Sequence, residues 1–304
     1  MKVLVTGATG FVGREVVRQL HAAGHAIRML ARTPTSARVQ EAVSRWGVEV
    51  RPGDVLDAAS LEGAARGSDA VIHLVGIISE VGTSTFENVH LGGTRNMVAA
   101  AQHAGARRFL QMSALGTRAN AASRYHQTKW AAEEFVRQSG LDFTIFRPSV
   151  IFGPEDQFIN LFARIIRLSP VVPLLGSPRA RLQPISVAAV AAAFVCSLSK
   201  PETAGKTYDL CGMEALPLAV IVDEILQVMG RKRLKLQVPL QLARGQAALL
   251  EFVFQRLLRK PPPLNRDQLI MLQEDNLGNP RPANAELGLP ILRLRDGIAK
   301  YLAG

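Results

Sequence analysis

Near its start the chain reads Thr6-Gly7-Ala8-Thr9-Gly10-Phe11-Val12-Gly13. A short apolar run precedes this stretch and predicts a strand, and helical spacing of apolar residues follows it. Between a strand and a helix, Gly7 permits a tight turn, Gly10 lets the backbone approach a diphosphate, and Gly13 allows close packing of the helix on the sheet. The N–H groups at the start of the helix favour an anion. The turn therefore predicts a diphosphate-binding site, and a glycine-rich turn without a ligand is the alternative.

Alternating strand and helix patterns continue from this turn to about residue 150. Short, mostly apolar runs predict strands at Lys2–Thr6, Ala26–Ala31, Val48–Arg51, Asp69–Val75, Arg107–Met112 and Asp142–Phe146. Helical spacing predicts helices at Phe11–Ala23, Thr35–Trp46, Ala59–Arg66, Phe86–Ala104 and Ser123–Ser139. A glycine follows each helix, as is typical of a helix C-terminus. The pattern predicts an α/β fold of the Rossmann type, with a doubly wound parallel sheet.

Proline-rich loops interrupt this regularity after Gly153-Pro154. Beyond them the sequence predicts a strand at Lys206–Leu210 and helices at Phe158–Leu168, Val187–Ser199, Leu218–Met229 and Leu240–Leu258. We therefore expect a dinucleotide-binding core in residues 1–155, to which residues 184–212 return. Residues 156–304 are expected to form a smaller, mostly helical lobe for substrate or partner interaction.

The composition is that of a globular protein, with 48% hydrophobic and 20% charged residues among 304. Its two cysteines, Cys196 and Cys211, cannot form a disulfide framework and favour a reducing compartment. The first apolar run is too short for a signal peptide, and no run reaches the roughly 18 apolar residues of a membrane-spanning helix. We expect a cytoplasmic protein.

The net charge of +11 is concentrated in residues 231–260, which hold eight basic residues and one acidic residue, Glu251. This segment includes the predicted helix Leu240–Leu258, which is rich in leucine and phenylalanine. A basic amphipathic helix of this kind can lie on the inner face of a membrane. The alternative is a helix that covers the lobe and has solvated charges. Aromatic residues do not interleave with the basic ones, so nucleic-acid binding is not expected.

The end of the second predicted strand bears on the choice of coenzyme. An NAD-binding site would have an Asp or Glu there for the ribose hydroxyls, but this chain has Arg32. Arg32 and Arg14 together would suit a 2′-phosphate, so NADP(H) is favoured over NAD(H). A solvated Arg32 is the alternative. After the third strand, Asp54 could accept a hydrogen bond from an adenine amino group or could be a simple turn residue.

Tyr125 and Lys129 lie four residues apart on one face of a predicted helix. An ammonium group near the phenol would lower the pKa of Tyr125, as proton transfer during hydride exchange requires. An ordinary helix surface is the alternative. The histidines show no metal-ligand spacing, so no metal site is expected.

These motifs resemble the short-chain dehydrogenase/reductase superfamily, in its extended and atypical branch. The resemblance rests on the glycine turn, Asp54, Gly93–Asn96, Tyr125 with Lys129, and Arg147–Pro154. Three further segments resemble bacterial relatives of the NADPH-binding accessory subunit of respiratory complex I, namely Lys129–Glu133, Phe146–Pro154 and Pro263–Leu269. The resemblance implies a tightly held nucleotide.

The motifs and the resemblance together give the expected site residues. The expected catalytic residues are Tyr125 as general acid/base, Lys129 as its partner and ribose ligand, and Ser113 as an imperfect carbonyl ligand. The expected coenzyme-binding residues are Gly7, Thr9, Gly10, Phe11, Val12, Gly13, Arg32, Asp54, Val55, Leu74, Val75, Gly76, Tyr125, Lys129, Pro148 and Val150.

Three positions depart from the pattern of active relatives. Ala114 stands where those relatives carry a hydroxyl donor, His90 replaces an asparagine that orders water near the lysine, and Ala189 replaces an aspartate. Loss of a donor to the reacting oxygen commonly lowers the rate by about 10²–10³. We therefore expect an NADP(H)-holding protein that acts near quinones, the respiratory chain or lipids. An active NADP(H)-dependent reductase, or a nucleotide-sugar epimerase or dehydratase, is the alternative.

Overall fold

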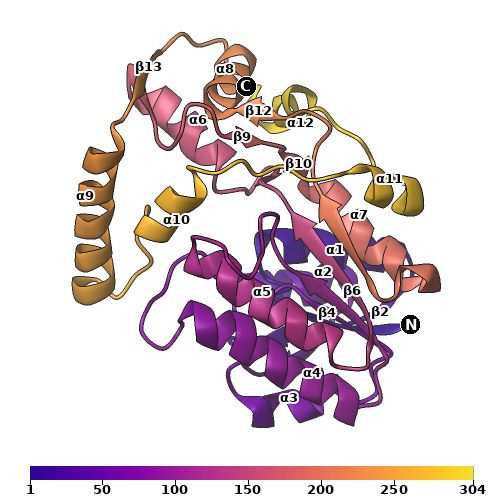
Figure 1. Cartoon of the computed structure of the whole chain (residues 1–304). Coiled ribbons are helices and arrows are strands. Elements are labelled where there is room, and N and C mark those ends of the chain that lie inside the picture. Colours follow the sequence, from indigo (N-terminus) through magenta and orange to yellow (C-terminus); the bar gives the residue numbers. More distant parts are fainter. Residues whose placement is uncertain (304) are drawn as a thin grey trace.

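A seven-stranded parallel sheet forms the centre of the computed structural model, which describes residues 1–303 (Figure 1). Residue 304 of the predicted lobe, and the side chains of residues 256 and 257 in the predicted amphipathic segment, lie outside the described part. The strands are β1 (Lys2–Thr6), β2 (Ala26–Ala31), β3 (Glu49–Pro52), β4 (Ala70–His73), β5 (Arg108–Met112), β6 (Asp142–Pro148) and β11 (Lys206–Leu210). Their order is β11-β6-β5-β4-β1-β2-β3, and every neighbouring pair is parallel. The predicted Rossmann-type fold is confirmed.

The strand order reverses between β1 and β4, where the two halves of the sheet diverge. In such sheets a crevice opens at this point, beyond the carboxyl ends of the strands. The residues that follow β1 are those of the glycine turn, and the residues that follow β4 begin with Leu74. The topology therefore brings two separated segments of the sequence to one crevice.

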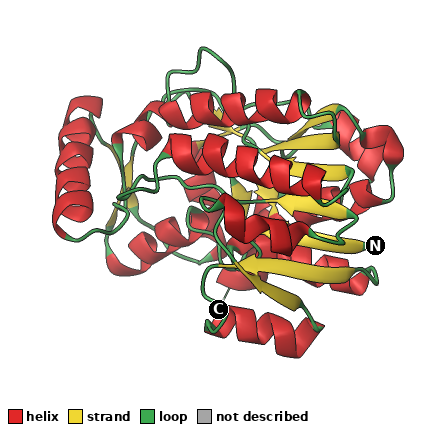
Figure 2. Ribbon diagram, turned by 90° about the horizontal axis from the view of Figure 1, so that it is seen from below, coloured by secondary structure: helices red, strands yellow, loops and turns green. Residues whose placement is uncertain are grey.

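Helices cover both faces of the sheet (Figure 2). One face holds α1 (Phe11–Ala22), α2 (Ala37–Trp46), α7 (Val187–Leu198) and α11 (Arg281–Leu287). The other face holds α3 (Ala58–Ala65), α4 (Gly93–His103) and α5 (Arg124–Arg137). Side chains alternate between the faces along β1, where Val3 and Val5 join the first core and Leu4 joins the second. Because both faces are covered, the inner strands β1, β2 and β4 are largely buried and mostly apolar, whereas β3 and β11 at the edges of the sheet are partly exposed.

Two predicted elements differ from the structure near the crevice. The strand predicted at Asp69–Val75 ends at His73, and residues 74–76 leave the sheet instead. The helix predicted at Phe86–Ala104 is divided into a π-helical turn, η1 (Glu87–Gly92), and α4. Turns of the π type inside helices frequently occur at functional sites, and this one contains the buried His90.

The remaining elements form a small, mostly helical lobe, as predicted for the fold class. Its elements are β7 (Ile151–Phe152), α6 (Ile159–Leu168), β8 (Val171–Leu174), β9 (Arg181–Leu182), β10 (Ile185–Ser186), β12 (Leu216–Pro217), α8 (Leu218–Val228), β13 (Leu234–Gln237), α9 (Leu240–Glu251), the π-helical turn η3 (Phe252–Leu257), α10 (Arg266–Met271) and α12 (Leu294–Leu302). The 3₁₀ turn η2 (Pro201–Thr203) precedes β11. Helices α6, α8 and α12 share one apolar core. Strand β11 belongs to the sheet, and helix α7 packs on it. The predicted domain boundaries stay a prediction.

Helix α9 stands at the edge of the molecule beside α10 (Figure 1). Its fully buried residues are Ala243 and Ala247, which pack with Leu269 of α10 in a small apolar cluster. A helix attached through two alanines leaves most of its surface outside the protein core. None of the described helices combines the length and the apolar character that crossing a membrane requires.

Candidate coenzyme and active site

The glycine turn joins β1 to α1 and has no room for a side chain at Gly7 or Gly13. Gly7 has φ of +77°, and a Cβ atom on it would lie 3.2 Å from the carbonyl carbon of Leu74. Gly10 is the N-cap of α1, and no side chain in the described part of the chain caps that helix. The first N–H groups of α1 are therefore available to an anion. A Cβ atom on Gly13 would lie 2.2 Å from the carbonyl oxygen of Gly7, so this glycine sets the distance between helix and turn.

A cleft of about 420 Å³ extends from this turn along the ends of β2, β3 and β4. Nine predicted coenzyme residues line it, namely Gly7, Thr9, Gly10, Arg32, Asp54, Val55, Leu74, Val75 and Gly76. The lining residues that the sequence analysis missed are Leu30, Ala31, Thr33, Ser36, Val39, Gly53, Leu56, Ile77, Ser84 and Val89. Most of them directly flank the predicted ones at the carboxyl ends of the strands. The rule that ligands bind beyond those ends could have identified them.

The far end of the cleft, at β2 and β3, is polar. Arg32 is exposed there beside Thr33 and Ser36, and it has no hydrogen-bond or ion-pair partner among the described residues. The one acidic residue in the lining is Asp54, whose carboxylate accepts the N–H of Leu56 at 3.0 Å. This arrangement leaves a free guanidinium group at the cleft.

The prediction that Arg14 shares this role is wrong. The Arg14 guanidinium pairs with Glu41 at 3.0 Å and with Glu155 at 2.6 Å, and it lines a different cavity. A guanidinium group held by two carboxylates is not available to a phosphate. Glu155 comes from the loop after β7, a distant contact that local sequence does not reveal.

The other seven predicted coenzyme residues lie outside the lining of the cleft, and two of them, Tyr125 and Lys129, are described below. Phe11 faces Gly153, where a Cβ atom would lie 3.1 Å from its ring. Val12 is buried and Gly13 packs against the turn. The carbonyl oxygen of Pro148 accepts the N–H of Leu115 at 2.9 Å, and the carbonyl oxygen of Val150 accepts the N–H of Ile185 at 2.9 Å. Their coenzyme roles stay predictions.

Lys129 lies next to the cleft, on the far side of Gly76. Its ammonium group is buried and donates a hydrogen bond to the carbonyl oxygen of Met112 at 3.1 Å. A Cβ atom on Gly76 would lie 2.9 Å from the Lys129 Nζ atom, so the absence of a side chain at Gly76 makes room for the ammonium group. Burial lowers the pKa of Lys129 to about 8, and the charge of Glu133 opposes that change.

Tyr125 is half-buried one turn before Lys129, among aromatic rings. The edge of its ring meets His90 at a centroid distance of 5.2 Å and Phe86 at 5.9 Å. Its hydroxyl group has no hydrogen-bond partner among the described residues. Burial, followed by the charge of Asp267, raises the pKa of Tyr125 to about 12. The prediction of a lowered phenol pKa is therefore wrong for the free protein, because desolvation outweighs any effect of Lys129.

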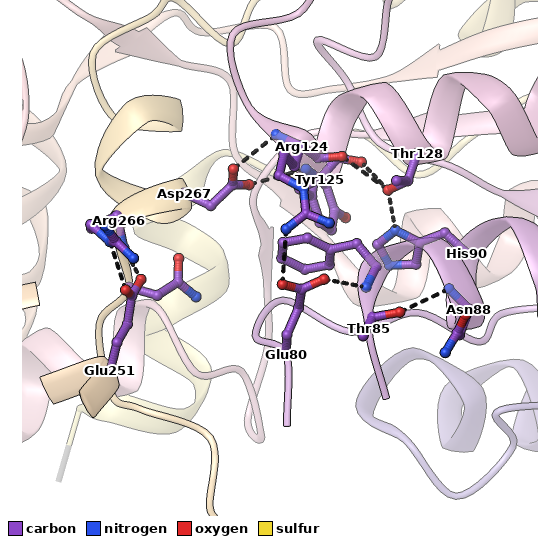
Figure 3. Close-up of polar contacts among 12 residues, drawn as sticks. Glu80, Thr85, Asn88, His90, Arg124, Tyr125, Thr128, Glu251, Arg266 and Asp267 are labelled. Atoms are coloured by element: carbon purple, nitrogen blue, oxygen red, sulfur yellow. Dashed lines mark hydrogen bonds and ion pairs between the residues drawn. The ribbon is translucent and has the colours of Figure 1, made fainter. Parts of the chain in front are cut away.

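His90 and Ser113 complete the surroundings of Lys129. The His90 Nδ1 atom lies 2.9 Å from the hydroxyl oxygen of Thr128 (Figure 3). The His90 Nε2 atom lies within 3.2 Å of the backbone nitrogen and oxygen of Ile77. Burial, together with the nearby Lys129 charge, lowers the pKa of His90 well below its usual range, so the ring is neutral. The hydroxyl of Ser113 is buried without a partner among the described residues, and Ala114 follows it.

The arrangement combines a helix N-terminus suited to a phosphate, an elongated cleft, and a lysine–tyrosine pair next to the Gly76 end of the cleft. These features define a Rossmann-fold protein of the short-chain dehydrogenase/reductase superfamily. Residues 7–163 match the family described as NAD(P)H-binding, and the chain belongs to this family.

Individual relatives agree with this assignment. The chain is 30% identical over 281 residues to "NADH dehydrogenase [ubiquinone] 1 alpha subcomplex subunit 9, mitochondrial" of Arabidopsis thaliana, covering 90% of this chain and 70% of that one. It is 28% identical over 333 residues to "Sterol demethylase protein B" of Methylococcus capsulatus, covering 100% of this chain and 98% of that one. The predicted resemblance to the complex I accessory subunit is confirmed.

A solved structure shows the same fold over the whole chain. It is the NADPH-dependent quinone oxidoreductase QOR2 of Escherichia coli, complexed with NADPH. Its TM-score is 0.79 at 22% sequence identity, with 99% of this chain and 100% of that chain covered.

Proposed function

We propose that this protein binds NADP(H) in the cleft and retains it, with Tyr125 and Lys129 next to the nicotinamide end. The observation that carries the proposal is the continuity of the cleft. It runs from Arg32 at the end of β2, past the N-terminus of α1, to Gly76, next to which the Lys129 ammonium group is buried. A dinucleotide needs a diphosphate site in the middle and polar partners at both ends, and here these are the N-terminus of α1, Arg32 at one end and Lys129 beside the other.

The preference for NADP(H) rests on the charge of the adenosine end. Arg32 has no internal partner among the described residues, and no carboxylate of the lining lies at the end of β2. A guanidinium fork binds a phosphate bidentately, whereas a carboxylate at this place would repel it. The hydroxyl groups of Thr33 and Ser36 offer further donors to the same phosphate.

Replacement of Arg32 by alanine is expected to weaken NADPH binding about 10- to 100-fold and to leave NADH binding unchanged, because one charge-assisted contact to the 2′-phosphate is lost. Isothermal titration calorimetry with both coenzymes measures this. Arg14→Ala is the matched control, since Arg14 is engaged by Glu41 and Glu155, and it should not alter the ratio of the two affinities. An unchanged NADPH preference in Arg32→Ala would remove the phosphate assignment.

The site supports coenzyme retention better than rapid turnover. When bound, the nicotinamide would supply or accept a hydride. Tyr125 would then donate or accept the proton, and Lys129 would hold the ribose hydroxyls. Ala114 provides no hydroxyl to a reacting oxygen, and the Ser113 hydroxyl is buried beside it. The missing donor is expected to reduce the rate about 10²–10³-fold.

An apolar substrate, a quinone or a lipid, is the substrate class that the relatives favour. One relative is a subunit of an NADH dehydrogenase [ubiquinone], and the other is a sterol demethylase protein. We propose slow reduction of such a compound as the second candidate activity, with sugar-nucleotide epimerisation as the remaining alternative. The fluorescence of copurified NADPH, followed during incubation with quinones and sterol ketones, distinguishes retention from reduction. Epimerisation leaves the coenzyme unchanged overall, so it is tested by chromatography of sugar nucleotides incubated with the protein.

We also propose that segment 231–260 binds an anionic membrane surface. Leu242, Leu249 and Phe252 lie on one stripe of α9 and its continuation, and each is at least 60% exposed. Ala243 and Ala247 face the protein, so the apolar stripe faces away from it. Five exposed basic residues belong to the same segment, namely Arg231, Lys232, Arg244, Arg259 and Lys260. Apolar residues beside basic ones fit the interface of an anionic bilayer.

Replacement of both Leu249 and Phe252 by serine is expected to reduce vesicle binding about tenfold, because insertion of two large apolar side chains is lost. Flotation with phosphatidylcholine vesicles that contain phosphatidylglycerol measures this, and vesicles of phosphatidylcholine alone should bind the protein weakly. Ile291→Ser is the control, since Ile291 is 65% exposed outside the segment. Equal flotation of the two variants would contradict a membrane contact through α9.

A further inference from the structure

Three consecutive residues at the start of α10 contact three different parts of the molecule. Asn265 is buried and caps its own helix, with its side-chain oxygen accepting the N–H of Gln268 at 2.7 Å. Its amide group also donates to the carbonyl oxygen of Ile78 at 2.8 Å and to the hydroxyl of Ser79 at 2.7 Å. Ile78 and Ser79 directly follow Gly76 and Ile77, which line the cleft. Asn265 therefore holds the loop that forms one wall of the cleft.

Asp267 holds the helix that carries Tyr125. One carboxylate oxygen accepts the backbone N–H of Arg124 at 2.8 Å, and the other accepts the backbone N–H of Tyr125 at 3.1 Å (Figure 3). These groups lie in the first turn of α5, where N–H groups have no partner within the helix. The hydroxyl oxygen of Ser123, the N-cap residue, accepts the backbone N–H of His126 instead, at 3.2 Å. The helix thus depends on a carboxylate 142 residues away in the sequence.

Arg266, between these two residues, binds the end of α9. Its guanidinium group pairs with Glu251 at 2.7 Å, and its N–H donates to the same carboxylate (Figure 3). Residues 265–267 are therefore held both by the cleft loop and α5 and by the end of α9. They belong to the Pro263–Leu269 motif, for which the sequence alone suggested no task.

We propose that Asn265 and Asp267 act as a clasp that positions Tyr125 against the nicotinamide end of the cleft. This inference rests on the proposed function, because it takes Tyr125 as a ligand of the coenzyme. Asp267 holds the backbone of Tyr125 itself, and Asn265 holds the loop at Ile78 and Ser79, so the spacing between this loop and α5 is set by one turn of α10. A carboxylate at a helix N-terminus forms charge-assisted hydrogen bonds and is favoured by the helix dipole. Asp267 is a positioning residue, since it reaches the coenzyme only through Tyr125.

The test compares two ligands of different length. NADPH spans the whole cleft, whereas adenosine 2′,5′-bisphosphate reaches only the Arg32 end. Asp267→Ala is expected to weaken NADPH binding about tenfold and to leave the affinity for the bisphosphate unchanged. Asp267→Asn, which retains an acceptor oxygen, should recover part of the loss. Asp223→Ala, which removes another carboxylate of the lobe, is the matched control.

A double-mutant cycle with Tyr125→Phe shows whether Asp267 acts through Tyr125. The double variant should bind NADPH no more weakly than the weaker single variant, because both changes remove one interaction. Additive losses, or equal losses for NADPH and the bisphosphate, would overturn the clasp. If neither ligand binds the unmodified protein, the proposed function fails instead, so the two failures are distinguishable.

Discussion

Replacement of Lys129 by methionine is expected to stabilise the free protein at neutral pH while it weakens coenzyme binding. The ammonium group is buried, and in the described structure it has one hydrogen bond, to the carbonyl oxygen of Met112. Burial lowers its pKa from 10.5 to about 8. A difference of this size corresponds to about 3 kcal/mol of lost stability, of which the hydrogen bond offsets about 1 kcal/mol. The variant should therefore be more stable by about 2 kcal/mol.

The pH dependence of this gain follows from proton binding. Between about pH 8 and 10.5 the unfolded chain still holds the Lys129 proton and the folded chain does not, so the stability of the wild type rises with pH in this window. Below pH 8 Lys129 is protonated in both the folded and the unfolded chain, so the whole free-energy cost of burying its charge lowers the stability of the wild type. The advantage of Lys129→Met should consequently be largest at pH 7 and should shrink by pH 10.5.

Urea unfolding at pH 7 and at pH 10 measures the difference in stability, and calorimetry with NADPH measures the loss of affinity. That loss is expected to be about 10- to 100-fold, because two hydrogen bonds to the ribose would disappear. Lys232→Met is the control, since Lys232 is exposed. If Lys129→Met is instead less stable than the wild type at neutral pH, the buried ammonium group does not destabilise the folded protein, which would contradict a lowered pKa of Lys129.

The sheet could be predicted closely because its strands are read from short apolar runs. Strands β1, β2 and β11 have the predicted bounds. The inner strands β1 and β2 are buried on both faces, so their apolar signal is local and strong, whereas β11 at the edge of the sheet is only partly buried. Helix α1 begins at the predicted residue, Phe11, directly after its N-cap Gly10 in the glycine turn.

The candidate site was less predictable, because its chemistry depends on contacts between distant parts of the chain. Arg14 has the right position in sequence for a phosphate, but Glu155 neutralises it from 141 residues away. The spacing of Tyr125 and Lys129 predicted a lowered phenol pKa, while burial and Asp267 produce the opposite. Spacing identifies which residues lie on one helix face, whereas desolvation depends on everything packed against that face.

The same reasoning explains why the C-terminal motif yielded no role. Asn265 forms a capping box with Gln268, and such a pattern predicts only the start of a helix. Its bonds to Ile78 and Ser79 join residues more than 180 positions apart. No local rule connects them.

Replacement of Gly13 by alanine is expected to lower both the stability of the protein and its affinity for the coenzyme strongly. The added Cβ atom would lie 2.2 Å from the carbonyl oxygen of Gly7 and 2.6 Å from the Cα atom of Ala8. Both are backbone atoms of the turn, so no side chain can rotate away. Helix α1 would have to move, and its N–H groups would lose their place at the diphosphate site. Overpacking of this kind costs about 3 kcal/mol, and NADPH affinity should fall more than about 100-fold.

Gly63 provides the matched control, because it is an exposed helical glycine of α3 with no atom within 4 Å of the position that a Cβ atom would take. Gly63→Ala is expected to stabilise the protein by about 0.5–1 kcal/mol and to leave coenzyme binding intact. Thermal unfolding of both variants, with and without NADPH, separates the two effects. Because the substitutions are chemically identical, a difference in sign can only come from what surrounds each glycine. Wild-type melting and wild-type NADPH affinity in Gly13→Ala would show that α1 and the turn can separate, and the diphosphate site would then not depend on their close contact.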